Sequence, residues 1–179
     1  MLDIIDRVLI SEEEIVERCK QLGKQISQDY RGCTPILIAL LKGSVPFLSE
    51  LMKYIDIEME TEYMVVSSYG NATQSSGEVK INKDLDRSIK DCDVIIVEDI
   101  VDTGRTLKAV KELLISKGAK TVKIVTLLNK KEHRVVDIDA DYVGFDIPDE
   151  FVLGFGLDYE QKYRNLPYVG VLKEEFYKE

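Results

Sequence analysis

The sequence has no tryptophan, one histidine and only three cysteines among its 179 residues. Cys19, Cys33 and Cys92 are widely spaced, odd in number and form no CxxC pair, so neither a disulfide framework nor a zinc site is predicted. The histidine, His133, shows no partner in the sequence and is predicted to be exposed rather than catalytic. No apolar run approaches the length that crosses a membrane. We therefore expect a cytoplasmic chain that folds without cross-links.

Basic residues are also comparatively few, with 24 Lys and Arg against 33 Asp and Glu and a net charge of -9. A nucleic-acid-binding surface requires a basic face, so neither nucleic acid nor a membrane is an expected partner. A phosphorylated small molecule stays possible. Mg²⁺ can bridge clustered carboxylates to phosphate, and backbone N–H groups bind phosphate whatever the net charge.

The length and the periodicity of the apolar residues predict one α/β domain over residues 1–179. Ser11 and Glu14 form a capping box at the start of a helix that is predicted to end near Asp29. Shorter helices are expected near 45–52 and 105–118. Strands alternate with these helices, which predicts a mainly parallel sheet flanked by helices; they are expected at 36–41, 57–66, 93–97, 121–128 and 142–147.

Two regions do not fit this alternation. Residues 67–80 are polar and poor in apolar side chains, and the stretch is longer than most connections in compact domains, so it is either a disordered surface loop or a lid. After Pro148 the chain is rich in glycine and aromatic residues without helical period, which predicts a small irregular or antiparallel subdomain.

The segment 94–107 carries the most chemical information. An apolar strand leads into Glu98 and Asp99, and a loop then opens a helix with the residues Asp102-Thr103-Gly104-Arg105-Thr106. Ligands of open α/β sheets bind at the carboxyl ends of the strands, and a loop entering a helix presents N–H groups to an anion. We therefore expect this loop to hold a phosphate, with Gly104 allowing close backbone approach and the threonine hydroxyls adding donors.

Glu98 and Asp99 would repel such an anion, but they can accept hydrogen bonds from sugar hydroxyls or hold Mg²⁺ through water. A ribose phosphate would satisfy both halves of the segment. The simpler alternative is that Asp99 and Asp102 only cap the helix that begins near Arg105, which is a common role of aspartate.

This order of residues resembles the signature of the phosphoribosyltransferases that binds 5-phosphoribosyl-1-pyrophosphate (PRPP). Further segments between Ile36 and Arg164 are similar to the hypoxanthine-guanine branch, in the same order. The resemblance implies a type I phosphoribosyltransferase fold, with a mobile flap at about 67–80 and a small hood subdomain formed by the N- and C-terminal segments. It also implies a homodimer or a homotetramer.

Two of the similar segments concern the leaving group and the flap. Leu41-Lys42-Gly43-Ser44 resembles the family's pyrophosphate loop, in which the backbone of the Lys42 and Gly43 positions contacts pyrophosphate. The family has a cis peptide there, and the residues themselves do not decide whether Leu41–Lys42 is cis. Ser68 and Tyr69 resemble the start of the flap, which closes over the reacting centre and excludes water.

The remaining similar segments concern the base and the metal. The resemblance implies that Lys130 bonds O6 of a purine, that Phe151 stacks on the ring and that the Val152 backbone meets its edge. It also implies that Asp158 holds Mg²⁺ and that Arg164 contacts pyrophosphate. From the residues alone, Lys130 also fits a solvated charge run, Phe151 the core and Asp158 a turn.

The resemblance implies an enzyme of purine salvage that transfers the phosphoribosyl group of PRPP to N9 of hypoxanthine or guanine. Mg²⁺ would be held by Glu98, Asp99 and Asp158, while Asp102 exchanges a proton with N7 of the purine. One alternative is a regulator that senses PRPP, against which the lack of a basic tract argues. Another is an adenine or uracil enzyme, which does not predict Lys130. The choice among 6-oxopurines and the role of the Arg105 side chain stay open.

Overall fold

The computed structural model of the protein describes residues 3–68 and 79–177. Six strands form a sheet of order β4-β3-β2-β5-β6-β7, in which all neighbours are parallel except the antiparallel pair of β3 and β4. The strands are β2 (Ile36–Leu40), β3 (Glu60–Ser68), β4 (Val79–Lys83), β5 (Asp93–Val101), β6 (Thr121–Asn129) and β7 (Tyr142–Asp146). The predicted mainly parallel α/β fold is confirmed.

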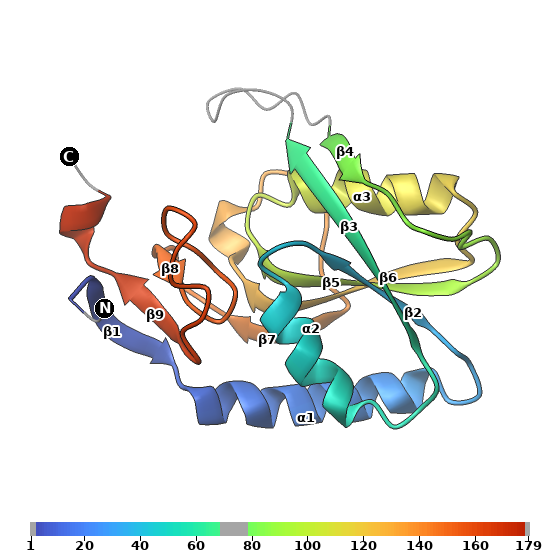
Figure 1. Ribbon diagram of the computed structural model, residues 1–179, viewed down its shortest axis with the longest axis horizontal. Coiled ribbons are helices and arrows are strands. Elements are labelled where there is room, and N and C mark those ends of the chain that lie inside the picture. Colours follow the sequence, from blue (N-terminus) through green and yellow to red (C-terminus); the bar gives the residue numbers. More distant parts are fainter. Residues whose placement is uncertain (1–2, 69–78, 178–179) are drawn as a thin grey trace.

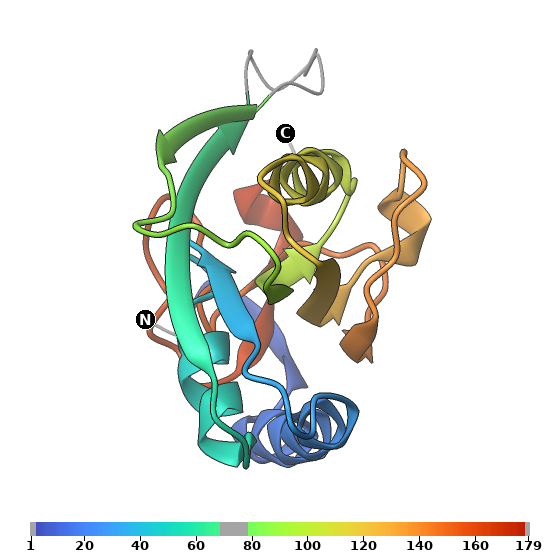
Figure 2. The ribbon, with the colours of Figure 1, turned by 90° about the vertical axis from the view of Figure 1, so that its right-hand side faces the viewer.

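Helices cover both faces of this sheet (Figure 2). The helices α1 (Glu12–Asp29) and α2 (Val45–Leu51) pack on one face, and α3 (Arg105–Ser116) packs on the other. Successive side chains of a strand point to opposite faces, so in the fully buried β2 the side chain of Leu37 joins the core under α1 and that of Ile38 the core under α3. Continuous apolar strands are therefore required at the centre of the sheet.

A second, antiparallel sheet joins the two ends of the chain (Figure 1). It consists of β1 (Ile5–Ile10), β9 (Val169–Leu172) and β8 (Val152–Leu153), in the order β1-β9-β8. We call this sheet the hood. Its assembly from N- and C-terminal segments matches what the family resemblance implies.

The structure departs from the sequence prediction at the end of β5. The predicted loop began at Glu98, but the strand continues to Val101 because its backbone goes on pairing with β6 as far as Asn129. Glu98 and Asp99 therefore lie on a strand. The strands β1 and β4 were not predicted: adjacent polar and adjacent apolar residues interrupt the alternation in β1, and β4 is only five residues long and has no buried side chain.

The remaining helical elements of the described residues are three single 3-10 turns: Met52–Tyr54, Lys131–His133 and Glu174–Phe176. Of the predicted flap, residues 67–68 end β3 and 79–80 begin β4, while 69–78 lie outside the described residues. None of the described helices combines the length and the apolar content needed to cross a bilayer.

Candidate active site

The predicted site residues meet at the carboxyl ends of three adjacent parallel strands. The strand β2 lies between β3 and β5. The chain adds β3 and β4 on one side of β2 and then β5, β6 and β7 on the other, and open α/β sheets bind ligands at such a switch point. The loop after β2 carries Lys42 and Gly43. The end of β5 carries Asp99 and Asp102, and β6 leads directly into Lys130.

The turn after β2 packs tightly against the acidic end of β5. A Cβ atom on Gly43 would lie 1.7 Å from Oδ2 of Asp99, and a Cβ on Gly156 would lie 1.9 Å from the carbonyl oxygen of Gly43. Gly156 is required because the obstacle there is backbone, whereas a Cβ on residue 43 would force either the turn or the Asp99 carboxylate to shift. The Leu41–Lys42 peptide is cis, as in the family that the sequence resembles.

The two acids at the end of β5, Glu98 and Asp99, are both largely removed from water. Removal from water, together with the charge of Asp99, raises the pKa of Glu98 well above its ordinary range. Removal from water also raises the pKa of Asp99, although the Ile100 N–H donates to its Oδ1 at 2.8 Å. A pair of carboxyl groups in this state favours a ligand that brings hydrogen-bond donors or positive charge.

A cavity of about 220 Å³ is lined by the end of β5, the turn after it and the start of α3, including Thr103 and Thr106 but not Arg105. The N-cap of α3 is Gly104, with a φ of 81°, and not an aspartate, so the N-cap residue offers no side chain to the helix. The capping alternative for Asp99 and Asp102 is therefore wrong. The start of α3 thus keeps N–H groups available for an anion.

The packing behind the loop also restricts residue 104 to glycine. Besides its positive φ, a Cβ there would lie 2.6 Å from Cγ2 of Ile138 and 2.9 Å from Cδ of Arg134. The loop is thus held from behind by the segment that follows β6.

A larger cavity of about 780 Å³ brings together the predicted base residues with Asp99 and Asp158 of the predicted metal residues, while Glu98 lines only the smaller cavity. The two cavities share Asp99, Ile100 and Asp102. The lining of the larger cavity also includes Lys130, Phe151, Val152 and Asp158. The two cavities therefore adjoin along the end of β5, with both aspartates at the junction.

Lys130 is not part of a solvated charge run. It is only 8% exposed, and its Nζ lies 3.6 Å from Oδ1 of Asp149. Its neighbour Lys131 is exposed and pairs with Asp146 at 2.9 Å. A buried ammonium group costs solvation free energy, so its place in the cavity lining favours a ligand-binding role.

Phe151 lies at the surface of the larger cavity, 37% exposed, and so is not a core residue. The ring of Tyr177 stacks on it with centroids 5.4 Å apart and planes at 28°. Tyr159 meets it edge-on at 5.9 Å. Val152 follows in β8, where it pairs with Val171 of β9.

Asp158 and Arg164 form an ion pair at 2.7 Å. Asp158 also accepts the N–H of Gln161 at 2.8 Å, so it does organise a turn. Nη1 of Arg164 donates to the carbonyl of Gly156 at 2.7 Å. Arg164 is therefore held next to the loop that packs on Gly43.

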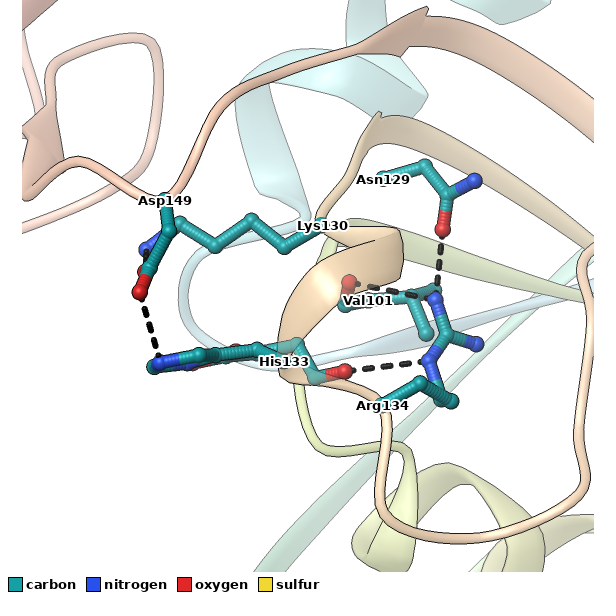
Figure 3. A network of polar contacts seen from close by, with 7 residues as sticks. Val101, Asn129, Lys130, His133, Arg134 and Asp149 are labelled. Atoms are coloured by element: carbon teal, nitrogen blue, oxygen red, sulfur yellow. Dashed lines mark hydrogen bonds and ion pairs between the residues drawn. The ribbon is translucent and has the colours of Figure 1, made fainter.

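His133 is the residue that the sequence analysis missed. It is exposed as predicted, but its Nδ1 lies 2.8 Å from Oδ1 of Asp102. Its Nε2 lies 3.0 Å from Oδ2 of Asp149 (Figure 3). These partners are 31 and 16 positions away, and no spacing in the sequence signals the contacts. Of the two predicted flap residues, Ser68 ends β3 and Tyr69 lies outside the described residues.

The model of the phosphoribosyl transferase domain family matches residues 9–160. The chain therefore belongs to the phosphoribosyl transferase family, and within it to the hypoxanthine-guanine phosphoribosyltransferases, to which the similarities below extend over nearly the whole chain.

The chain is 60% identical to the hypoxanthine-guanine phosphoribosyltransferase of Lactococcus lactis, over 97% of this chain and 94% of that protein. Among solved structures, a hypoxanthine phosphoribosyltransferase of Staphylococcus aureus matches with a TM-score of 0.96 and 50% identity, covering 99% of this chain and 96% of that one. The Trypanosoma cruzi hypoxanthine phosphoribosyltransferase in complex with the product IMP matches with a TM-score of 0.92 and 39% identity, covering 98% of each chain.

Proposed function

We propose that this protein transfers the 5-phosphoribosyl group of PRPP to N9 of hypoxanthine or guanine, which gives IMP or GMP and pyrophosphate. The observation that carries the proposal is the junction of the two cavities at Asp99 and Asp102. A phosphate site on one side of these acids and an aromatic-lined site on the other suit a ribose that lies between a phosphate and a base.

The smaller cavity suits the ribose 5-phosphate of PRPP. The loop Thr103-Gly104-Arg105-Thr106 would bind the phosphate through backbone N–H groups and hydroxyls. Glu98 and Asp99 would accept hydrogen bonds from the ribose hydroxyls. Lys42 and Gly43 would contact pyrophosphate through their backbone, and Arg164, which already lies next to that turn, would bind its oxygens.

The larger cavity suits the purine. Lys130 would donate to O6, Phe151 would stack on the ring, and the Val152 backbone would meet the base edge. The C1–pyrophosphate bond breaks as the bond from C1 to N9 forms, and Asp102 would take the proton that the purine loses at N7. Catalysis then rests mainly on positioning and electrostatics.

Glu98, Asp99 and Asp158 would hold Mg²⁺. Their chemistry fits this ion, since a cation would favour the ionised carboxylates against the removal from water that raises the pKa of Glu98 and of Asp99. Within residues 3–68 and 79–177 no three His, Cys, Asp or Glu side chains are grouped to hold a metal by themselves. The three acids would therefore not enclose the ion by themselves, and water and substrate phosphates would complete its coordination, as is usual for Mg²⁺. When bound, Mg²⁺ would neutralise the departing pyrophosphate.

The remaining proposals concern the whole chain. We infer that residues 1–179 act as one phosphoribosyltransferase domain in the cytoplasm, as a homodimer or homotetramer. The flap, to which Ser68 and Tyr69 are assigned by resemblance, would exclude water from the reacting centre. Sedimentation velocity at several concentrations separates the two assembly states.

The experiment incubates the purified protein with PRPP, Mg²⁺ and, separately, hypoxanthine, guanine, xanthine, adenine and uracil, and measures the nucleotide by chromatography. A parallel series replaces Mg²⁺ with EDTA. Nucleotide from hypoxanthine or guanine that requires Mg²⁺ is the expected result. Product from adenine or uracil alone would contradict the assignment of Lys130, and no product from any base would favour a PRPP-sensing regulator.

A further inference from the structure

Four polar side chains form a continuous chain along the larger cavity. Lys130 contacts Asp149 at 3.6 Å, Asp149 contacts His133 at 3.0 Å, and His133 contacts Asp102 at 2.8 Å. Figure 3 shows the imidazole of His133 reaching across to Asp149 beside the stem of Lys130. All four residues line the same cavity, and the two ends of the chain are the side chains proposed to read O6 and N7 of the purine.

The members of this chain come from three different loops. Asp102 follows β5, Lys130 and His133 follow β6, and Asp149 follows β7. Each strand end could therefore shift relative to the others, and His133 is the side chain that contacts an aspartate on both sides.

The turn that carries His133 is itself anchored. The next residue, Arg134, donates from Nε to the carbonyl of Asp102 at 3.0 Å and from Nη2 to Oδ1 of Asn129 at 2.5 Å (Figure 3). A third bond joins its Nη1 to the carbonyl of Ile138 at 2.5 Å. The guanidinium group thus ties the turn to the ends of β5 and β6, which fixes the backbone from which His133 projects.

In this series of four side chains, the chemistry of the groups determines which one donates each hydrogen bond. Ionised carboxylates only accept hydrogen bonds, so His133 is the donor toward Asp102 when Nδ1 carries hydrogen, and toward Asp149 when Nε2 does. A bond to Oδ1 of Asp102 leaves Oδ2 for the base. In a 6-oxopurine, O6 and N7 lie on one edge, so the distance between Lys130 and Asp102 must match that edge.

We propose that His133 is a positioning residue, which with Asp149 sets Asp102 and Lys130 at the separation of N7 and O6 of a 6-oxopurine. This inference rests on the proposed function for the identity of the base. The two contacts that His133 makes with Asp102 and Asp149, which we call the bridge, are a property of the free protein. Two other charged groups lie on the same turn. Lys131 is paired with Asp146, and Glu132 is exposed.

The first arm of the test uses the protein without substrates. His133 is the only histidine, so its imidazole gives a single Cε1–H signal in the NMR spectrum. We expect Asp102→Asn and Asp149→Asn each to move this signal, whereas Glu132→Ala leaves it in place. If the chemical shift of the His133 signal changes in neither aspartate variant, the proposed bridge is wrong, whether or not the protein is active.

The second arm uses turnover with hypoxanthine. His133→Ala should lower kcat/KM for hypoxanthine roughly tenfold to a hundredfold, since a misplaced reacting group costs on this scale, and should leave the KM for PRPP unchanged. His133→Gln, which keeps one donor, should lie between His133→Ala and the parent. Glu132→Ala is the matched control on the same turn, and thermal unfolding checks that each variant is folded.

The outcomes are distinguishable. If the parent forms no nucleotide, the proposed function fails and the NMR arm still decides on the bridge. If the parent is active and His133→Ala behaves like Glu132→Ala, the positioning role is wrong. A loss that affects the KM values for PRPP and hypoxanthine alike also overturns it, because a positioning role at the base predicts an effect on hypoxanthine alone.

Discussion

Gly43 and Asp99 approach so closely that a Cβ on residue 43 would lie 1.7 Å from Oδ2 of the aspartate. This contact joins the turn after β2 to the end of β5 across the switch point of the sheet. The proposed pyrophosphate turn and the Asp99 carboxylate are therefore in close contact, with no room for a side chain at position 43 unless one of them shifts.

Gly43→Ala should accordingly abolish most of the turnover. Either the turn or the Asp99 carboxylate must shift, and a displacement of about 1 Å at reacting groups can reduce the rate roughly a hundredfold. Steady-state kinetics with hypoxanthine and calorimetric binding of PRPP measure the effect, and both should weaken.

The matched control for this variant is Gly32→Ala. Gly32 has a positive φ of 81°, a Cβ there meets nothing within 4 Å, and the residue precedes β2, whereas the site lies after the carboxyl end of that strand. The substitution should lower the free energy of unfolding by about 1–2 kcal/mol through backbone strain and leave turnover unchanged. Equal turnover in the two variants would show that the Gly43–Asp99 contact has no functional weight.

The acid pair at the end of β5 predicts an unusual dependence of stability on pH. The pKa of Glu98 is raised in the folded state, so at low pH the carboxyl is protonated in both states and carries no penalty. As the pH rises from about 4, the ordinary carboxyl pKa, the unfolded chain ionises before the folded one does, and the folded state loses stability. Glu98→Gln should therefore raise Tm at neutral pH.

The size of this gain should shrink as the pH approaches 4. Calorimetric scans of the parent and Glu98→Gln across this pH range measure the gain in Tm. Glu132→Gln, which removes one carboxylate from an exposed turn, is the control. A gain that does not change with pH would argue against the burial of an ionisable Glu98. Mg²⁺ with PRPP should stabilise the parent more than Glu98→Gln.

Much of the fold follows from local patterns. The capping box of Ser11 and Glu14 is present with both hydrogen bonds, at 2.8 and 3.2 Å, because the side chains that form it lie within one helical turn. The strand β2 and residues 94–97 of β5 are recognisable because both of their faces are covered by helices, which leaves these stretches wholly apolar.

The hood strand β1 and the extension of β5 depend instead on partners that are distant in the sequence. Arg7 pairs with Val171, and Val101 with Asn129, and neither pairing leaves an alternating pattern that periodicity could detect. The same holds in the site. The family resemblance supplied Lys130 and Phe151, while the contacts of His133 arise only when three loops meet.

Asp102→Asn tests the proton transfer. Asparagine keeps the size of the side chain but cannot accept the proton from N7, so turnover should fall by about 10² to 10⁴. The affinity for PRPP should be retained, because its proposed contacts lie at other residues. Stopped assays and calorimetry measure the two quantities, and circular dichroism confirms folding. Turnover near that of the parent would remove Asp102 from the mechanism.

The aromatic pair of Phe151 and Tyr177 makes the C-terminal turn part of the base site. Their stacking at 5.4 Å fixes the ring of Phe151, and the Tyr159 hydroxyl holds the turn by donating to the carbonyl of Phe176 at 2.8 Å. An aromatic pair contributes about 0.5–1.5 kcal/mol, so Tyr177→Ala should raise the KM for hypoxanthine about two- to twelvefold. The KM for PRPP should not change.

Phe176→Ala provides the control, since that side chain is 38% exposed on the same turn and does not line the cavity. The direction of the change is informative. A rise in KM for hypoxanthine with Tyr177→Ala alone shows that the tyrosine supports Phe151 from within the pocket wall. A fall in KM would instead show that the Tyr177 ring takes the place of the purine and must leave before the base stacks on Phe151.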